Sequence, residues 1–313
     1  MKKIVRPIIV AAMLLGLVSQ QVYAIDTTAI NEKWGKPTVV YGGGLNDQQI
    51  KETSKLLGIK DENTVTTTKA TGEDLVKYLG AGEANTSVMI SSVMVQKRNK
   101  GEGVKVHIAT PKNITLVTSE QYANAAITAG VADAEIEVAA VSKVTGESAL
   151  TGVYKAFEAN GVVLDGKRTA VAQKELELTN QIAQEQAKEK GFDAAKLDQA
   201  MIDIKKSLAE IKEKQGQVAT KEDVERIVNE ALKKYGLDKV ISPTQVDNII
   251  QFALSYQQTS AIDSKQVLEQ LNSLSNTVKG KIGQLVDQAN REGWFDKIVT
   301  FFKEIFNAIF SSK

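Results

Sequence analysis

The sequence predicts an α+β protein, in which an N-terminal mixed sheet with short helices is followed by an all-helical C-terminal half. Three observations support this fold class. Short β-branched or apolar runs of strand length recur between residues 38 and 141. Several of them lead into helix-like segments that are preceded by an N-cap residue or followed by a glycine. From about Arg168 onward, apolar residues recur only at the three- and four-residue spacing of helices.

Composition excludes several classes of function. The chain has 313 residues and no cysteine, so disulfides, thiolate catalysis and cysteine-ligated metals are excluded, and the length suggests about two domains. Its 39 basic and 38 acidic residues are interleaved and give no broad basic field. We therefore expect no nucleic-acid partner.

Residues 1–24 are typical of a signal peptide. Lys2, Lys3 and Arg6 precede an apolar run over residues 8–18, and the residues before and at Ala24 suit a signal peptidase. An uncleaved membrane anchor is the alternative, but about 11 apolar residues are too few for a bilayer that needs about 20. We expect cleavage after Ala24 and a secreted, extracellular protein that is either free or associated with the cell surface. Loss of three basic residues would change the net charge from +1 to −2.

Residues 25–165 are expected to form the α+β domain, which begins with a strand at Thr38–Tyr41. Three glycines at 42–44 follow, and then a helix that starts near Asn46 or Asp47 and ends at Gly58. A strand, glycines and a helix start could hold an anion. However, the Lys-Ser or Lys-Thr pair of a P-loop and the GxGxxG spacing of a dinucleotide site are both missing. We favour a tight turn in which glycine supplies a positive φ.

The next segments predict an edge strand and a β-hairpin. The polar, β-branched run Thr64–Thr68 suits an edge strand. Residues 87–96 and 104–109 are the two clearest extended segments, and the connection between them is polar and contains glycine. This arrangement predicts a β-hairpin.

The charged residues of this region could act on a ligand or serve the structure alone. Lys97, Arg98 and Lys100 could bind an anion, but Glu102 lies beside them and no aromatic residues are interleaved, so we favour a solvated loop. His107, the only histidine, could act as a general base. Because no cysteine and no GxSxG serine is present to partner it, we expect a structural or surface histidine.

The stretch from Ile114 to Gly161 predicts the central unit of this domain. Thr118 and Gln121 have the spacing of a capping box, and Gly130 suits the end of the helix that follows. The expected elements are a strand at 114–117, a helix from about Ser119 to Gly130, a strand at 134–141 and a helix at 147–160. Glu135 and Glu137 share one face of the second strand, which we interpret as its solvated face.

Three blocks of the chain carry a resemblance to a known family. They are SSVMVQKRNKGEGVKVHI, ITLVTSEQYANAAITAGV and SALTGVYKAFEANG. The chain resembles the YpuA-like secreted proteins of Gram-positive bacteria, a domain family of unknown function, from about Thr38 to Gly216. Its YGGGL segment departs from the single glycine, small residue and acid expected there, which weakens an anion-binding role for the glycines. The resemblance implies export and an α+β core and assigns no catalytic residue.

Residues 166–290 are expected to form a helical region. One heptad seam extends for about two heptads, too short for a free-standing coiled coil, so we expect it to pack on its neighbours in an antiparallel hairpin or bundle. This seam consists of Leu197, Met201, Ile204, Leu208 and Ile211. Further helices should start after the cap residues Thr220 and Ser242, and Gly280 and Gly283 interrupt the last apolar stripe.

Residues 291–313 predict an amphipathic, aromatic terminal helix. Five of the eight phenylalanines and one of the two tryptophans follow Gly293. Burial of such a face is worth about 1.5 to 3 kcal/mol per large side chain, so it requires a partner. Candidate partners are the protein's own helices, a second copy in self-association, or a membrane surface, although the polar face is not rich in Lys. The expected contact residues are Trp294, Phe295, Ile298, Phe301, Phe302, Ile305, Phe306 and Ile309.

Two functions are consistent with these features of the sequence. The first is a secreted or envelope-associated, non-enzymatic protein that binds another protein or an envelope component, with no catalytic, cofactor or metal residues. The second is an envelope hydrolase whose acids are drawn from Asp47, Glu73, Glu135 and Glu137. Hydrolysis would require two carboxyl groups that converge in a concave pocket, one with a pKa raised by burial.

Overall fold

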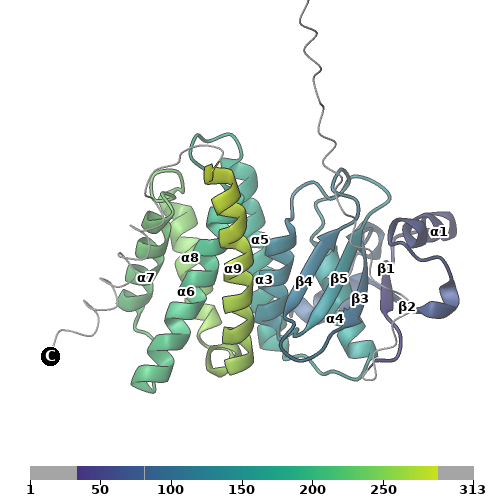
Figure 1. Ribbon diagram of the computed structural model, residues 1–313, viewed down its shortest axis with the longest axis horizontal. Helices are drawn as coiled ribbons and strands as arrows, with labels where there is room; N and C mark the ends of the chain where they lie inside the picture. Colours follow the sequence, from purple (N-terminus) through teal and green to yellow (C-terminus); the bar gives the residue numbers. More distant parts are fainter. Residues whose placement is uncertain (1–33, 81, 288–313) are drawn as a thin grey trace, which may run out of the picture.

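The computed structural model describes residues 34–80 and 82–287, and it shows an α+β fold with a helical C-terminal half. Figure 1 shows the sheet at one end of the molecule and the helical bundle at the other, with α3 and α5 between them. The strands are β1 (Thr38–Gly42), β2 (Thr66–Ala70), β3 (Ser92–Lys97), β4 (Val104–Ile108) and β5 (Ala134–Ala139). The α-helices are α1 (Asp47–Leu56), α2 (Gly72–Leu79), α3 (Ser119–Ala129), α4 (Ser148–Ala159), α5 (Gly166–Gln186), α6 (Ala194–Gln215), α7 (Lys221–Lys234), α8 (Pro243–Tyr256) and α9 (Lys265–Asp287).

The five strands form one mixed sheet in the order β2-β1-β3-β5-β4. β1 and β2 pair in parallel, as do β4 and β5, while β3 lies between the two pairs and is antiparallel to both neighbours. β2 is therefore an edge strand, as its polar sequence predicts. β4 is the opposite edge.

The β-hairpin expected from residues 87–109 does not form, because β5 lies between β3 and β4. The connection folds around Asp133, just before β5. Its carboxylate accepts hydrogen bonds of 3.0 Å from the amides of both Gly101 and Gly103, and its carbonyl accepts one of 2.6 Å from the amide of Arg98. Both glycines have positive φ. The connection therefore curves around the start of β5 and does not form the tight turn of a β-hairpin.

The central unit is confirmed except for its first strand. The Thr118–Gln121 capping box forms, and Gly130 ends α3 in the left-handed conformation. Ile114, however, makes only an isolated bridge to Val144, so residues 114–117 are not a strand. Ile114 and Val117 are buried in the core, which accounts for their apolar character without a sheet.

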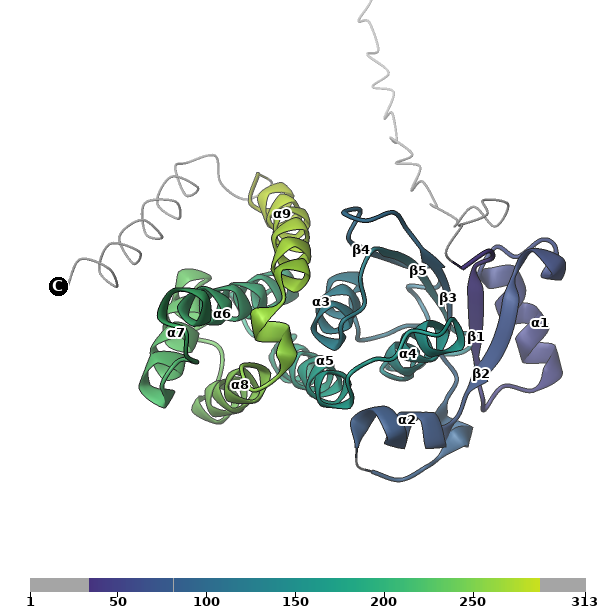
Figure 2. The same cartoon turned by 90° about the horizontal axis from the view of Figure 1, so that it is seen from below.

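Helices cover the two faces of the sheet unequally. α3 and α4 pack on one face and α1 lies on the other, beside β1 and β2 (Figure 2). The α1 side holds a small apolar cluster whose buried residues are Val39, Tyr41, Leu45, Leu57, Ile59, Val65, Met94 and Ala139. The main core fills the other side and continues into the helical half.

The helical half is a bundle built around α6. Its predicted seam is buried, and α6 packs against α7 and α9, as expected for a short seam within a bundle. α5 packs against α3 and α8 and so joins the bundle to the sheet side. α9 runs unbroken through Gly280, where a Cβ would meet no atom within 4 Å.

α3 is enclosed by both halves of the chain. Every residue from Gln121 to Ala129 is buried, and the helix contacts β4 and α4 on the sheet side and α5, α6 and α9 on the helical side. One apolar cluster therefore extends from Val40 to Ile282. The division at about residue 165 coincides with the start of α5, but two independent domains stay a prediction.

A fully buried ion pair lies where α3 meets the bundle. Lys205 of α6 is completely buried, and its Nζ lies 2.7 Å from Oε1 of Glu175 on α5. The same ammonium donates to Oδ1 of Asn124 at 2.6 Å and to Oγ1 of Thr128 at 2.9 Å. Burial lowers the pKa of Lys205, and the charge of Glu175 opposes that effect. The network thus supplies partners for the Asn124 and Thr128 side chains of α3.

Replacement of Lys205 with methionine should destabilise the protein by about 3 to 5 kcal/mol, since it leaves the Glu175 carboxylate buried without its cation. The double variant Lys205→Met/Glu175→Gln should recover most of that loss. Urea unfolding followed by circular dichroism measures both free energies. Lys233→Met on the exposed side of α7 is the matched control and should be nearly neutral. Equal stability of Lys205→Met and the control would contradict this role.

Candidate functional site

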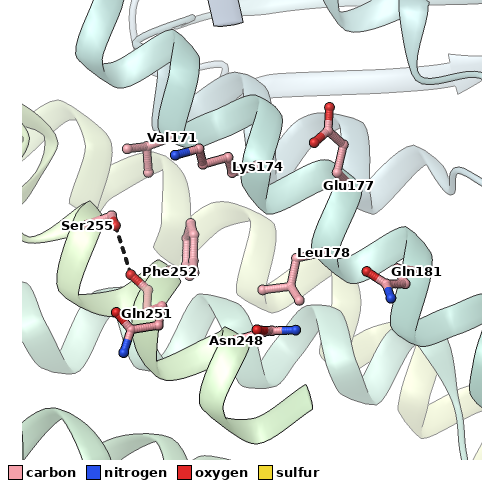
Figure 3. Close-up of a pocket in the computed structure, with 9 residues that line it drawn as sticks. All are labelled: Val171, Lys174, Glu177, Leu178, Gln181, Asn248, Gln251, Phe252 and Ser255. Carbon is pink, nitrogen blue, oxygen red and sulfur yellow. Dashed lines mark hydrogen bonds between the residues drawn. The ribbon is translucent and has the colours of Figure 1, made fainter. Parts of the chain in front are cut away.

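A groove between α5 and α8 is the candidate binding site. Its volume is about 290 Å³. Figure 3 shows its two walls, and its lining consists of Val171, Lys174, Glu177, Leu178 and Gln181 from α5 and Asn248, Gln251, Phe252 and Ser255 from α8. Phe252 is buried, whereas Lys174, Gln181, Asn248 and Gln251 are exposed. The groove therefore combines an apolar floor with a polar rim.

Helix periodicity explains how the sequence builds the groove. On α5, Lys174, Leu178 and Gln181 are spaced by four and three residues, and α8 repeats this pattern with its own lining residues. The sequence alone did not reveal the groove, because a polar helical stripe also fits a solvated face. The one local signal was Phe252, an aromatic residue next to exposed Gln251.

The chemistry of the groove suits recognition. Partial removal from water raises the pKa of Glu177, a hydrogen bond of 3.2 Å from Gln173 opposes the rise, and the charge of Glu147 adds to it. Lys174 supplies a cation, and the side chains of Gln181 and Asn248 supply amide donors and acceptors. Apolar contact surface with a few polar groups is the usual composition of a ligand site.

The glycine turn after β1 has no amide left for an anion. Each amide of Gly42–Gly44 is already hydrogen-bonded within the protein. The acceptors are Oγ of Ser92 for Gly42 at 3.0 Å, the carbonyl of Ala70 for Gly43 at 2.8 Å and the carbonyl of Met89 for Gly44 at 3.0 Å. An anion cradle requires free amides, so this segment is structural.

The expected reason for the glycines was wrong, since none of Gly42–Gly44 has a positive φ. They are needed for close approach of the backbone instead. A Cβ on Gly42 would lie 2.2 Å from the carbonyl oxygen of Met89, and one on Gly44 would lie 2.6 Å from that of Ser87. The backbone at Ser87 and Met89 therefore packs directly against the turn and leaves no room for a side chain at Gly42 or Gly44.

His107 forms a hydrogen-bonded pair with Glu137, and this corrects the interpretation of the acidic strand face. Nδ1 of His107 lies 2.7 Å from Oε2 of Glu137. The Glu137 side chain is only 3% exposed, so it does not face solvent. Its cross-strand neighbour on β3 is the buried residue Met94. Burial raises the pKa of Glu137, the hydrogen bond with His107 opposes the rise, and Glu135 adds to it.

The basic residues of the β3–β4 connection mostly serve the protein itself. Arg98 Nη2 lies 2.7 Å from Oε2 of Glu135, and its Nε lies 3.8 Å from Glu102. Lys97 hydrogen-bonds the carbonyl of Ala132. Of this group, only Lys100 has a side chain that makes no ion pair or hydrogen bond within the described part of the chain. The three residues therefore do not assemble an anion site.

The four carboxylates proposed for hydrolysis do not form one site. Asp47 and Glu73 are exposed in the first turns of α1 and α2, whereas Glu135 and Glu137 lie on β5, which β3 separates from β1 and β2. Within residues 34–80 and 82–287, no group of three or more His, Asp or Glu residues could hold a metal ion. In the same ranges, no helix has the length and apolar character that a bilayer crossing demands.

Two predicted segments lie outside the described residues. One is the leader at 1–24, and the other is the terminal stretch at 291–313. The latter contains all eight expected contact residues, Trp294, Phe295, Ile298, Phe301, Phe302, Ile305, Phe306 and Ile309. Their role stays a prediction.

Comparison with known proteins confirms the resemblance read from the three sequence blocks. A family model described as "Protein of unknown function (DUF1002)" matches residues 41–274. The uncharacterized protein YpuA of Bacillus subtilis (strain 168) is 30% identical over 317 residues, which cover 99% of each chain. No solved structure is significantly similar to this chain.

Substitution of Gly42 with alanine should destabilise the protein by about 1 to 3 kcal/mol, because the new Cβ overlaps the backbone at Met89. Gly166→Ala is the matched control, since a Cβ there meets no atom within 4 Å and lies in the first turn of α5. Chemical denaturation of the two variants tests the prediction. Similar denaturation midpoints for the two variants would show that close approach of the backbone is not the reason for glycine at position 42.

Proposed function

This chain belongs to the DUF1002 family of proteins of unknown function, and we propose that it is an exported, non-enzymatic binding protein of the cell envelope. The observation that carries the proposal is the groove between α5 and α8. It offers an apolar floor, one cation, one carboxyl group and several amides on two regular helices. This composition can select a ligand by shape and hydrogen bonding.

The α5 wall of the groove is held from behind by buried contacts. Glu175, one position from Lys174, belongs to the buried network with Lys205. Arg168 at the start of α5 donates from Nε to the carbonyl of Thr128 on α3 at 2.8 Å. Ligand side chains would therefore meet a preformed surface, which lowers the entropic cost of binding.

The two ends of the sequence support export and retention at the envelope. The leader at 1–24 directs the chain out of the cytoplasm. The aromatic stretch at 291–313 is an association segment whose apolar face is covered by the protein's own helices, by a second copy or by lipid. Of these three, association with lipid would hold the groove at the envelope.

One observation favours the second candidate, an envelope hydrolase. Glu137 has a raised pKa and lies near Glu135, which resembles the acid pair of a glycosidase. Substrate access argues against it. Oε2 of Glu137 is bonded to His107 and Oε1 is buried, while Glu135 is paired with Arg98. A binding protein accounts better for this geometry.

The groove is tested by cosedimentation of the leaderless chain with isolated cell walls from which membrane has been removed, so that lipid binding by residues 291–313 does not contribute. Phe252→Ala and Gln251→Lys change its floor and rim, and we expect at least about a fivefold loss of bound protein, in line with truncation of an interface anchor. Lys233→Glu, on the exposed side of α7, is the control and should bind normally. Equal sedimentation of all variants would remove the groove from the proposal. Release of soluble wall fragments by the wild type, abolished in Glu137→Gln, would instead support hydrolysis.

The association segment is tested by liposome flotation. The leaderless chain is compared with a truncation after Arg291, on vesicles of phosphatidylglycerol and phosphatidylethanolamine. If lipid covers the aromatic face, only the longer chain should float, because each buried aromatic side chain contributes about 1.5 to 3 kcal/mol. Equal recovery of the two chains in the lipid fraction would exclude lipid as the partner.

A further inference from the structure

β4 has an open edge whose backbone groups can be assigned from its pairing with β5. The carbonyl of Gly103 accepts from the amide of Ala134 at 3.0 Å, and the amide of Ala109 donates to the carbonyl of Val138 at 2.8 Å. Alternate residues of a parallel strand direct their N–H and C=O groups to the same neighbour. Lys105 and His107, which lie between Gly103 and Ala109, therefore also bond to β5.

The other residues of β4 direct their backbone groups away from the sheet. These are Val104, Val106 and Ile108, and no backbone partner for them exists on the outer side within residues 34–80 and 82–287. Val106 and Ile108 are half-buried, so the strand is not covered along its length. Figure 2 shows β4 as the last strand of the sheet, with α3 against its face. Val104 is buried, and Gly103 before it lies beside Ser273 of α9, so the open template for another strand consists of the amides and carbonyls of Val106 and Ile108.

The inner edge of β4 shows which sequence its side chains accept. Its partner, β5, reads Ala-Glu-Ile-Glu-Val-Ala, an alternation of acidic and apolar residues. In this register Lys105 lies opposite Glu135, Val106 opposite Ile136 and His107 opposite Glu137. Cross-strand pairs of opposite charge or of two apolar side chains stabilise a sheet. A strand on the outer edge would meet the same β4 side chains.

The charge around the open edge matches this pattern. Lys105 is exposed, as are Lys100 before β4 and Lys112 after it. In the described part of the chain, none of these three ammonium groups makes an ion pair or a side-chain hydrogen bond. An acidic strand would bring carboxylates to cations that have no other partner there.

We propose that the β4 edge binds an extended segment of another protein in which acidic and apolar residues alternate. The backbone of the segment completes the sheet, its acidic side chains face Lys105 and His107, and its apolar side chains continue the row of Val104, Val106 and Ile108. This surface is separate from the α5–α8 groove and does not depend on its function.

Two other pairings fit the edge chemistry less well. An antiparallel pair of β4 strands from two copies, centred on Val106, would place Lys105 opposite His107 and would contain no acid. The opposite edge of the sheet, β2, has the sequence Thr-Thr-Thr-Lys-Ala and lacks the apolar alternation. The charge pattern therefore favours a segment of a different protein over a second copy of this chain. It also favours β4 over β2 as the edge that binds this segment.

The test measures binding of a labelled, end-capped peptide with the sequence of residues 133–140 to the leaderless chain by fluorescence anisotropy. Saturable binding is expected, and the same peptide with Lys in place of both Glu residues should bind at least about fivefold more weakly. Lys105→Glu should weaken binding of the acidic peptide by about fivefold as well. Lys69→Glu, an exposed position on the β2 edge, is the matched control and should leave binding unchanged.

Backbone pairing is tested separately by the variant Val106→Pro and by amide exchange. Proline removes an outward N–H and leaves the inner bonds of Lys105 and His107, so it should reduce peptide affinity about tenfold while the circular dichroism spectrum is retained. In the unmodified chain, the peptide should slow exchange of the Val106 and Ile108 amides.

Three outcomes would overturn the proposal. They are no saturable binding of the acidic peptide, equal affinity of Lys105→Glu and Lys69→Glu for it, and unchanged exchange at the Val106 and Ile108 amides when it is bound. A dimer of the unmodified chain in sedimentation experiments that Lys105→Glu strengthens would assign the edge to self-pairing instead. Because Lys105 is exposed, the charge variant decides the matter even if Val106→Pro does not fold.

Discussion

α3 has almost no contact with water, and its burial dictates how the two halves of the chain meet. A helix so rich in alanine offers little apolar surface, so it can be enclosed closely on both sides. It also carries Asn124 and Thr128, whose side chains would be costly to bury alone. Lys205 and Glu175, from two helices of the C-terminal half, supply their hydrogen-bond partners. These hydrogen bonds join the sheet side and the bundle, in addition to the apolar contacts between them.

The same enclosure positions both candidate binding surfaces. α5 is held on one side by α3, and its other side forms a wall of the groove with α8. β4 is held on one face by α3 and on its inner edge by β5, so its outer edge and the face that carries Lys105 are left uncovered. In Figure 2, α8, which forms one wall of the groove, and β4 lie on opposite sides of α3. Recognition by such fixed surfaces requires little rearrangement.

Features that depend on neighbouring residues were predictable from the sequence. The capping box at Thr118 and the helix end at Gly130 form as expected, because caps use backbone groups within one turn. The apolar seam of α6 is buried for the same reason, since periodicity alone defines its face.

Features that depend on distant residues were not predictable. The hairpin failed because β5 inserts between β3 and β4, and nothing local to residues 87–109 encodes that pairing. Glu137 alternates like a surface residue, yet His107 on another strand gives it a buried partner. The groove requires α5 and α8 to lie side by side, and that juxtaposition is set by tertiary packing. Only Phe252 pointed to it from the sequence.

Because both halves of the chain enclose it, α3 should make the sheet and the bundle one cooperative unit. Native-state hydrogen exchange at increasing denaturant tests this directly, because amides that open only in global unfolding report one common free energy. We predict that protected amides of β5, α3 and α6 converge on the same value. Exchange of the α6 and α9 amides at clearly lower free energy, with the sheet amides still protected, would contradict it.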